Sequence, residues 1–553
     1  MRLSAPARKG AGSLRGLAFR TLPLAIAFIG SGAHAAQTIY LGDDTTLDSS
    51  LTLSYTASAR TSRPAAEYLN DLNSDDATRN FKRGALVNNR ASALGELRLR
   101  HDNVGAMLRG NIFYDGVYRS SNDNDSPDTV NKIGPANQFV RKTRERSGQD
   151  AQLLDAFVYG NWVVGNDQYL SVKLGRHVVA WGESLFWPNI SQGQLPVDAT
   201  KFNVPGTEAK ESYLPVGQLS ASLTLTDALS LTGYYQYKWE ETRLNPVGDF
   251  FGSDVFGPGA EFLRLAPGVI PSLPDNSFAV ANFAGEIKPK DSGQWGVGLR
   301  YQLSDALEVG VFHYRYHDRI GAMLFDFTGD TQYSSFSRFG REASPGSTPY
   351  YKLAYFDDIR LTGISVSSKI GDSVQFGGDL SYRDGAPVYL ENGSPARGSY
   401  LQGNANAIYI LGPSKLAHQT TLMGEIVHQR IMGVDPLTIS MGGVAVDTSS
   451  KYVYDGQTRG STLVGLGAIF DYPSIFSGWD LSTRAIWTQN VQGSAYSGMG
   501  RDEKRLTLGA DFKYLGNLAL GITWVNYLGS PSVKQQRTMA DRDYVSFNAK
   551  YTF

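Results

Sequence analysis

The chain has 553 residues, with 52 Lys and Arg against 53 Asp and Glu, 30 Tyr, 26 Phe and no Cys. This near-neutral balance gives no electrostatic basis for nucleic-acid binding. The absence of Cys excludes disulfides, Cys-bound zinc and thiol catalysis.

The N-terminal segment has the pattern of a secretory signal peptide. An apolar run extends from Leu22 to Gly30, small residues end at Ala35, and no acidic residue occurs before that point. The basic residues before the apolar run are Arg2, Arg8, Lys9, Arg15 and Arg20. We therefore expect a signal peptide over residues 1–35, cleaved near Ala35, and a single domain over residues 36–553. A retained anchor is the alternative, but the apolar run is too short to span a bilayer.

The rest of the chain alternates apolar and polar residues with period two. The pattern occurs near residues 51–57, 106–114, 374–382 and 506–524, and again at the end of the chain. There the apolar positions are Val545, Phe547, Ala549, Tyr551 and Phe553. Segments of about 10 to 13 residues match tilted strands that cross a bilayer, whereas strands of a soluble sandwich are about half as long. The sequence therefore predicts an all-β transmembrane antiparallel β-barrel.

The lengths of the connections predict the number of strands. Short turns rich in Gly, Asp and Asn alternate with long polar connections, as the periplasmic turns and extracellular loops of such barrels do. The short turns fall near residues 102–103, 164–167, 227–228, 304–305, 371–372, 412–415, 472–478 and 516–517. The long connections fall near residues 61–90, 116–149, 177–217, 241–293, 318–356, 385–401, 431–459, 491–503 and 529–542. About 18 strands follow, with 16 as the runner-up.

The end of the chain and the signal peptide together predict the cellular location. A terminal Phe553 after alternating apolar residues is typical of the signal by which the barrel assembly machinery recognises its substrates. We therefore expect a barrel in the outer membrane of a Gram-negative bacterium, surrounded by outer-membrane lipid.

The segment from Leu174 to Asn189 contains Trp181-Gly182-Glu183, and residues 205–211 read Pro-Gly-Thr-Glu-Ala-Lys-Glu. These motifs resemble those of a family of proteobacterial outer-membrane barrel proteins known only as a domain of unknown function. The similarity extends over most of the chain, for example through residues 248–254 and 381–388. Members are often encoded beside a resistance-nodulation-division-type transporter and an outer-membrane lipoprotein, so the resemblance implies these two as partners. It supplies no substrate and no binding residue.

The connection 177–217 is a candidate lumen constriction. It is long and rich in Trp, Gly and Pro, and charges held inside a narrowed pore decide which solutes pass. Its candidate residues are Glu183, Asp198, Lys201, Glu208, Lys210 and Glu211. The alternative is an external loop whose acidic and basic residues pair with one another.

Charged residues opposite the apolar face of each strand are expected in the lumen. The candidates are Arg98, Arg109, His313, Arg315, His317, Asp379, Arg383 and Arg484. Mixed charges suit internal pairing as well as a polar lumen, so we predict no strong ion selectivity. His313 and His317 lie about 13 Å apart on one strand face, so they cannot chelate one metal together.

These patterns favour transport over catalysis. Ser184 lacks the Gly-x-Ser-x-Gly turn of a hydrolase, and phosphate-binding glycine patterns are missing, so we expect no enzyme, no cofactor and no metal site. The expected function is an outer-membrane channel or transport component for small apolar or amphiphilic organic molecules, which are the expected solutes. Two rivals are a non-conducting scaffold that works with an envelope transporter and lipoprotein, and an outer-membrane hydrolase.

Overall fold

The computed structural model describes residues 37–165, 167–190, 195–265, 279–326, 350–390, 395–435, 438–441, 444–447, 458–494 and 499–553. The expected signal peptide and its cleavage near Ala35 lie outside these residues. Within the described ranges, no helix is long and apolar enough to cross a membrane.

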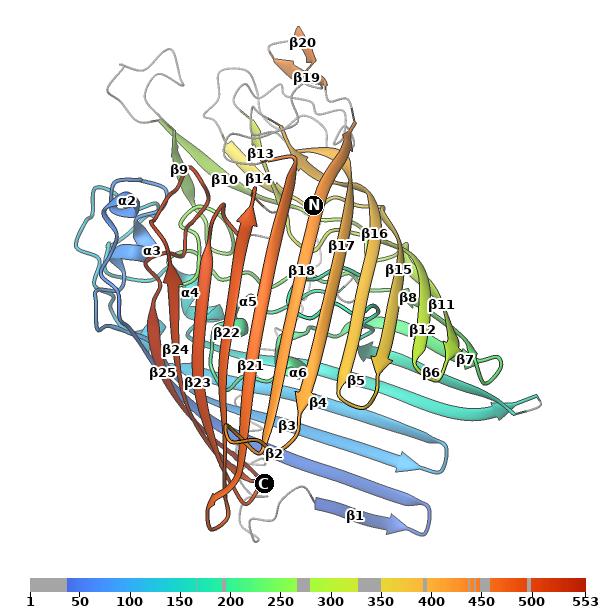
Figure 1. Ribbon diagram of the computed structural model, residues 1–553. Helices are drawn as coiled ribbons and strands as arrows, with labels where there is room; N and C mark the ends of the chain where they lie inside the picture. Colours follow the sequence, from blue (N-terminus) through green and yellow to red (C-terminus); the bar gives the residue numbers. More distant parts are fainter. Residues whose placement is uncertain are drawn as a thin grey trace, which may run out of the picture.

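The main sheet is a closed antiparallel barrel of 18 strands (Figure 1), which closes where β25 pairs with β2. The first nine strands around the wall are β2 (Thr45–Arg60), β3 (Leu86–His101), β4 (Val104–Asp115), β5 (Gln149–Val164), β6 (Gln168–His177), β7 (Val216–Thr224), β8 (Leu229–Gln236), β11 (Gln294–Ser304) and β12 (Leu307–Tyr316). The others are β15 (Ile359–Ile370), β16 (Val374–Tyr389), β17 (Pro395–Leu411), β18 (Gln419–Val434), β21 (Gly460–Phe476), β22 (Trp479–Gln492), β23 (Lys504–Tyr514), β24 (Leu518–Leu528) and β25 (Tyr544–Thr552). The predicted barrel of about 18 strands is confirmed, and the runner-up of 16 is wrong.

Short and long connections alternate along the wall, as the sequence predicts. The two-residue turn after β3 begins at Asp102, with φ of 48°, and the turn after β15 begins at Gly371, with φ of 58°. Positive φ values match the right-handed twist of the strands that such turns join. Local turn chemistry thus sets the register of each hairpin.

The outer surface of the wall is apolar. On β24, Ile522 and Trp524 are 52% and 37% exposed, whereas Thr523 and Val525 point inward and are 4% and 3% exposed. A closed barrel pairs the backbone groups of its wall strands, and an apolar outer band faces lipid. This is the architecture of an outer-membrane protein.

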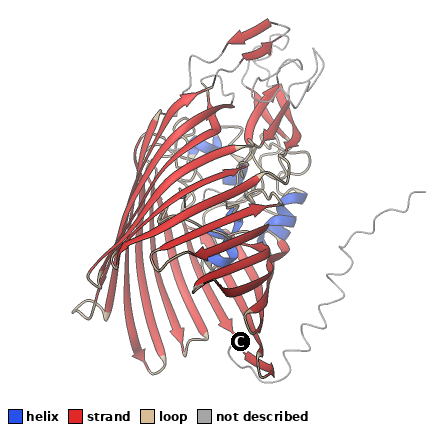
Figure 2. Cartoon of the chain, turned by 90° about the vertical axis from the view of Figure 1, so that its right-hand side faces the viewer, coloured by secondary structure: helices blue, strands red, loops and turns tan. Residues whose placement is uncertain are grey.

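Several smaller elements complete the described fold (Figure 2). Strand β1 (Gln37–Gly42) pairs with β2 in line with β25, because Gln37 faces Ser49 while Phe553 bonds to Leu51. A four-stranded sheet joins β9 (Phe262–Leu265), β10 (Ala279–Ile287), β13 (Ala322–Asp326) and β14 (Tyr350–Ala354), and a hairpin joins β19 (Thr438–Met441) and β20 (Val444–Asp447). The short helices are α2 (Ala66–Leu69), α3 (Asp76–Arg79), η3 (Val117–Arg119), α4 (Arg141–Arg146), α5 (Ala199–Phe202) and α6 (Ala209–Ser212). The sequence predicted none of these elements.

The wall is uneven in height. Strands β6, β7 and β8 have 10, 9 and 8 residues, whereas β16, β17, β18 and β21 have 16, 17, 16 and 17. The connection between β6 and β7 leaves the wall on its low side and makes its contacts elsewhere in the barrel.

Candidate lumen constriction

Residues 178–215, here called the lumen loop, join two neighbouring strands but contact strands around much of the barrel. One part of the loop bonds to Asp379 on β16 and Glu425 on β18, and another part bonds to Glu96 on β3 and Lys550 on β25. In the order of the wall, these two groups of strands lie on different sides of the barrel. The loop therefore crosses the interior rather than extending away from the extracellular rim.

Two carboxylates of the high wall fix the first part of the lumen loop. Asp379 accepts hydrogen bonds from the backbone N–H of Glu183 at 3.0 and 3.1 Å. Glu425 accepts from the N–H groups of Leu185, Phe186 and Trp187 at 3.1, 2.7 and 3.2 Å. Charge-assisted hydrogen bonds of this kind are about twice as strong as neutral ones. The two acids thus replace the strand partners that this stretch of backbone lacks.

Amide side chains on β17 satisfy the carbonyl groups of the same stretch. Asn406 donates to the Glu183 carbonyl at 2.6 Å, Asn404 to the Trp187 carbonyl at 3.1 Å, and Gln402 to the Pro188 carbonyl at 2.9 Å. These three residues occupy alternate positions on one strand face. The inner surface of β17 is therefore a row of donors matched to the loop backbone.

Aromatic packing anchors the loop just before this stretch and within it. The ring of Trp181 lies 5.0 Å from that of Tyr234 and 5.4 Å from that of Phe312. Phe186 lies against Gly465 of β21, where a Cβ atom would come within 2.7 Å of Phe186 Cδ2. A glycine at this position lets the loop approach the wall closely.

Charged residues fix the second part of the loop. Lys210 Nζ lies 2.7 Å from Glu96 and 3.1 Å from Glu208, which in turn lies 2.8 Å from Lys550. Burial opposes ionisation of Glu208, but its bonds to Lys550 and Lys210 outweigh this effect and hold its pKa below the usual range. Burial likewise disfavours the charged form of Lys210, yet its bonds to Glu96 and Glu208 hold its pKa above the usual range.

This network continues into the wall and into helix α6. Arg109 bridges Glu96 at 2.7 Å and Asp155 at 2.6 Å. The side chain of Glu211 accepts from the backbone N–H of Glu208 at 3.2 Å, as part of a capping box. The predicted residues Arg109, Glu208, Lys210 and Glu211 thus belong to one connected region.

Asp198 and Lys201 have a different place from the other candidates. Their side chains are 0% and 3% exposed, and Lys201 Nζ donates to Gln152 at 2.7 Å and to the Glu211 carbonyl at 3.1 Å. Asp198 caps α5 through the N–H of Thr200. By contrast, the side chains of Glu183, Lys210 and Glu208 are 23%, 33% and 40% exposed. Only the latter group presents charge to open space, whereas Asp198 and Lys201 hold the loop together.

Five of the eight expected lumen-facing residues lie on the inner face of the wall. Along the strands they alternate with outward residues such as Leu97, Leu108 and Leu380. Arg484 lies opposite Gly509, which is next to the outward Leu508. Arg484 forms an ion pair with Asp511 and donates to Thr523 at 2.8 Å. The five residues are Arg98, Arg109, Asp379, Arg383 and Arg484.

The expectation for the other three was wrong. On β12 the inward residues are Phe312, Tyr314 and Tyr316, which are 0%, 0% and 5% exposed and belong to the same apolar cluster as Trp181. His313 and Arg315 therefore point outward. His317 follows the strand and is enclosed by segments 292–294 and 357–358, with Nε2 3.0 Å from the Ser292 carbonyl. The assignment failed because the lumen loop supplies an apolar partner inside the barrel.

Sequence reasoning missed the residues that hold the loop from β17 and β18. Gln402, Asn404 and Asn406 alternate with Leu401, Gly403 and Ala405, and Glu425 precedes the outward Ile426. Uncharged amides on the inner face of a long strand were the available signal. Their regular spacing indicates that they bind a segment of backbone and do not only line a water-filled lumen.

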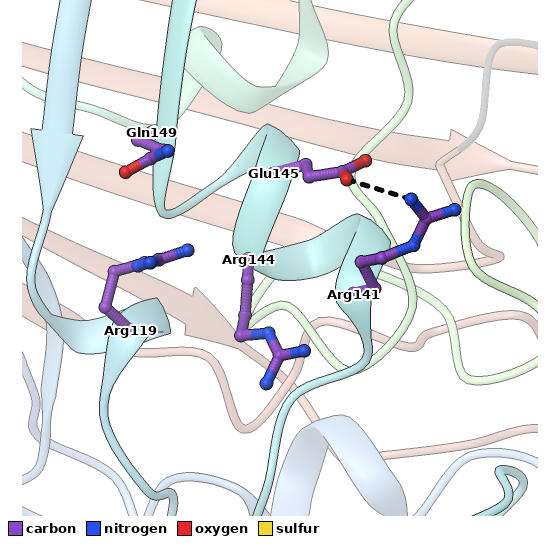
Figure 3. A pocket seen from close by; sticks show the side chains of 5 residues that line it. All are labelled: Arg119, Arg141, Arg144, Glu145 and Gln149. Carbon is purple, nitrogen blue, oxygen red and sulfur yellow. Dashed lines mark hydrogen bonds and ion pairs between the residues drawn. The ribbon is translucent and has the colours of Figure 1, made fainter.

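A separate cavity of about 390 Å³ lies among the extracellular connections (Figure 3). Arg119, Arg141 and Arg144 line it, together with Glu145 and Gln149. Arg141 lies 3.3 Å from Glu145, one turn further along α4. None of these lining residues belongs to the lumen loop, so this cavity is not part of the constriction.

The fold and the lumen loop together define an outer-membrane β-barrel whose interior is crossed by one of its own connections. The chain belongs to the family described as "Protein of unknown function (DUF1302)", whose model matches residues 17–553. The family to which the sequence motifs pointed is thereby confirmed. None of the curated protein sequences matches the chain significantly.

The solved structures to which the chain is similar include OccAB1 and OpdK. OccAB1 of Acinetobacter baumannii has a TM-score of 0.42 and 9% identity, with 94% of this chain and 99% of that chain covered. OpdK of Pseudomonas aeruginosa, solved with vanillate, has a TM-score of 0.39 and 10% identity, with 92% and 98% covered. Values this low give no basis for transferring a function to this chain.

Proposed function

We propose that this protein is an outer-membrane channel for small apolar or amphiphilic organic molecules, and that the lumen loop narrows its interior. The observation that carries the proposal is the attachment of one loop to β16–β18 on one side and to β2–β4 and β25 on the other. A connection built only as an external loop would not need carboxylates and amides on the inner faces of distant strands. Glu183, Glu208 and Lys210 supply charge of both signs at the narrowed region.

The size and polarity of the cargo follow from the same arrangement. A lumen crossed by a bound loop leaves room for small molecules only. Mixed charges beside aromatic side chains suit a solute that has both an apolar body and a polar group. The association of family members with envelope transporters, implied by the sequence resemblance, points to the same class of cargo and to those proteins as partners.

Conductance of the refolded full chain in a planar bilayer tests this function. We expect a steady open-channel current that grows several-fold when residues 192–210 are deleted, because the deletion removes four of the six charged candidate residues together with the backbone that carries them. A silent barrel in both forms would overturn the channel and favour the non-conducting scaffold. Equal currents in both forms would overturn the constriction but not the channel.

A further inference from the structure

The barrel wall is incomplete beside the upper part of β5. The pairing of β5 with β6 begins at Ala156 and Arg176, so residues 149–155 have β4 on one side and no barrel strand on the other. Their neighbours on the open side include residues 239–243, which carry Arg243, paired with Asp150. This stretch of wall is therefore covered by irregular chain instead of a continuous hydrogen-bonded ladder.

A cavity of about 770 Å³ lies at this gap. Its lining includes Leu153 and Arg176, which point to the outer surface, and Leu153 is 51% exposed. It also includes Gln152 and Leu214, which point inward, and Leu214 packs with Leu94 and Leu154 inside the barrel. The cavity thus touches both the outer surface of the wall and the lumen loop. We call it the side window.

In the described part of the chain, the two edges of the side window are joined by side chains. Asp150 pairs with Arg243, and Arg146 lies 3.0 Å from Glu241. These four side chains are 17% to 24% exposed. Ion pairs with solvent access contribute about 0–1 kcal/mol each, far less than a strand ladder of several hydrogen bonds. This stretch is therefore held less firmly than a stretch of wall with a continuous ladder.

An apolar groove leads to the side window along the outer face of the wall. It has a volume of about 380 Å³ and is lined by Leu97, Leu99, Leu108, Ala156, Val158 and Leu174, among others. Leu174 lies two residues before Arg176 on the same outward face of β6. The groove therefore runs from the lipid-facing band to a cation at the edge of the window.

The level of the side window is that of the lipid head groups. Tyr235 and Tyr237 are 45% and 46% exposed and point outward, and Tyr237 directly precedes Lys238, which lines the window. Outward aromatic residues at the end of a strand mark the interface between the apolar core and the head groups. A single-chain amphiphile lying in the groove would place its head group at the window.

We propose that the side window admits single-chain amphiphiles with a carboxylate head group between the outer leaflet and the lumen. Six Lys and Arg residues and three acidic residues line the window. At its outer edge, Arg176 and Lys238 pair with Glu240 and Asp291, whose side chains are 34% and 52% exposed, so an anionic head group can take the place of these carboxylates. Asp150, Asp198 and Glu286 pair with some of these cations from behind the lining, so the site holds an anion weakly enough for it to move on. This inference rests on the proposed channel in one respect only: the lumen is the place to which the amphiphile passes.

A photoactivatable fatty acid tests the binding step. The refolded full chain is placed in phosphatidylcholine vesicles, a long-chain fatty acid with a diazirine in its tail is added, and labelled peptides are mapped by mass spectrometry. We expect label on β4–β6 and on residues 195–214, reduced several-fold in Arg176→Ala with Lys238→Ala. Arg360→Ala with Lys369→Ala, which removes the same two residue types from exposed positions on β15, is the matched control. An equal loss of label in both double variants would contradict binding of the fatty acid at the side window.

A cross-link across the window tests passage. Since the chain has no Cys, Asp150→Cys with Arg243→Cys adds the only two thiols, and a short reductant-cleavable bis-methanethiosulfonate reagent can join them. We expect the cross-link to abolish the label on residues 195–214 and to leave the label on the outer groove unchanged. After reduction of the cross-link, the label on residues 195–214 should return. The pair His428→Cys with Thr462→Cys, on β18 and β21, is the control. Unchanged label on residues 195–214 would overturn passage through the window.

The two proposals fail separately. Bilayer current measures the axial pore and does not depend on the fatty acid, so a silent barrel that still shows window-dependent labelling contradicts the channel and not the window. A conducting barrel labelled only along the outer groove contradicts the window and not the channel. Far-UV circular dichroism of each variant checks that the barrel has formed.

Discussion

The two sides of the barrel differ in how they use the same kind of strand. On the high side, β16, β17, β18 and β21 have 16 or 17 residues and turn Asp379, Asn404 and Glu425 toward the lumen loop. On the low side, β6–β8 have 8 to 10 residues, and the chain leaves the wall to enter the lumen. Strand length beyond the bilayer thus serves to hold a loop, and missing strand length leaves a weak place in the wall.

The largest expected effect comes from the high side, at Glu425. Glu425→Gln removes the charge that holds three backbone N–H groups of the lumen loop. Since hydrogen bonds to charged groups are each worth about 1.5–3 kcal/mol, docking of the loop should weaken by at least about 2 kcal/mol. We expect bilayer conductance to rise several-fold. The control is Glu67→Gln, at an exposed position. Equal conductance in both variants would contradict the role of Glu425 in holding the lumen loop.

A smaller effect is expected from the glycine under Phe186. Gly465→Ala places a Cβ atom 2.7 Å from Phe186 Cδ2, and such overpacking costs about 1–3 kcal/mol. Gly95→Ala is matched because no atom lies within 4 Å of its added Cβ. Thermal unfolding followed by circular dichroism should show a lower midpoint for the first variant only. Equal midpoints would mean that the loop does not press on β21.

The exposed and buried lysines of the lumen loop should separate selectivity from stability. Lys210→Glu reverses a charge that is one-third exposed, so the reversal potential in a salt gradient should shift toward cations. Lys201→Met removes a side chain that is 3% exposed, and should lower stability without moving the reversal potential. A shift of similar size in both variants would contradict the distinction between the two residues.

The smallest expected effect is a pH dependence at Glu183. Burial raises the pKa of its carboxyl above the usual 4.5, against the opposing influence of Arg300. As the pH falls, Glu183 therefore takes up a proton earlier than an exposed Glu, and the permeability of the pore to cations relative to anions should decrease in a step above pH 4.5. Protonation also relieves the cost of a buried charge, so this step should not weaken the fold. Glu183→Gln should lack the step when reversal potentials are measured across this range.

Much of the wall was predictable because its determinants are local. Alternation such as that of Ile522 and Thr523, and turn residues such as Asp102 and Gly371, specify strands and hairpins within a few positions. The sheet formed by β9, β10, β13 and β14 joins distant segments without a repeating pattern, so it left no such signal.

The constriction was predictable only in part. The long connection 177–217 was recognisable, and the exposed charges Glu183, Glu208 and Lys210 follow from its composition. The burial of Lys201 depends on Gln152 and on backbone far along the chain. The inward face of β12 depends on Trp181, because apolar residues face the lumen wherever another part of the chain supplies an apolar partner there.

The seam between β2 and β25 has a consequence for the kinetics of folding. Thr52 and Thr552 bond across it at 3.0 Å although 500 residues separate them. Each doubling of the length of a closed loop adds about 0.6 kcal/mol of entropic cost. In an otherwise unordered chain, the pairing of β2 with β25 is therefore the least favourable wall pairing to form first. The hairpins should therefore assemble in sequence, so that the seam closes last.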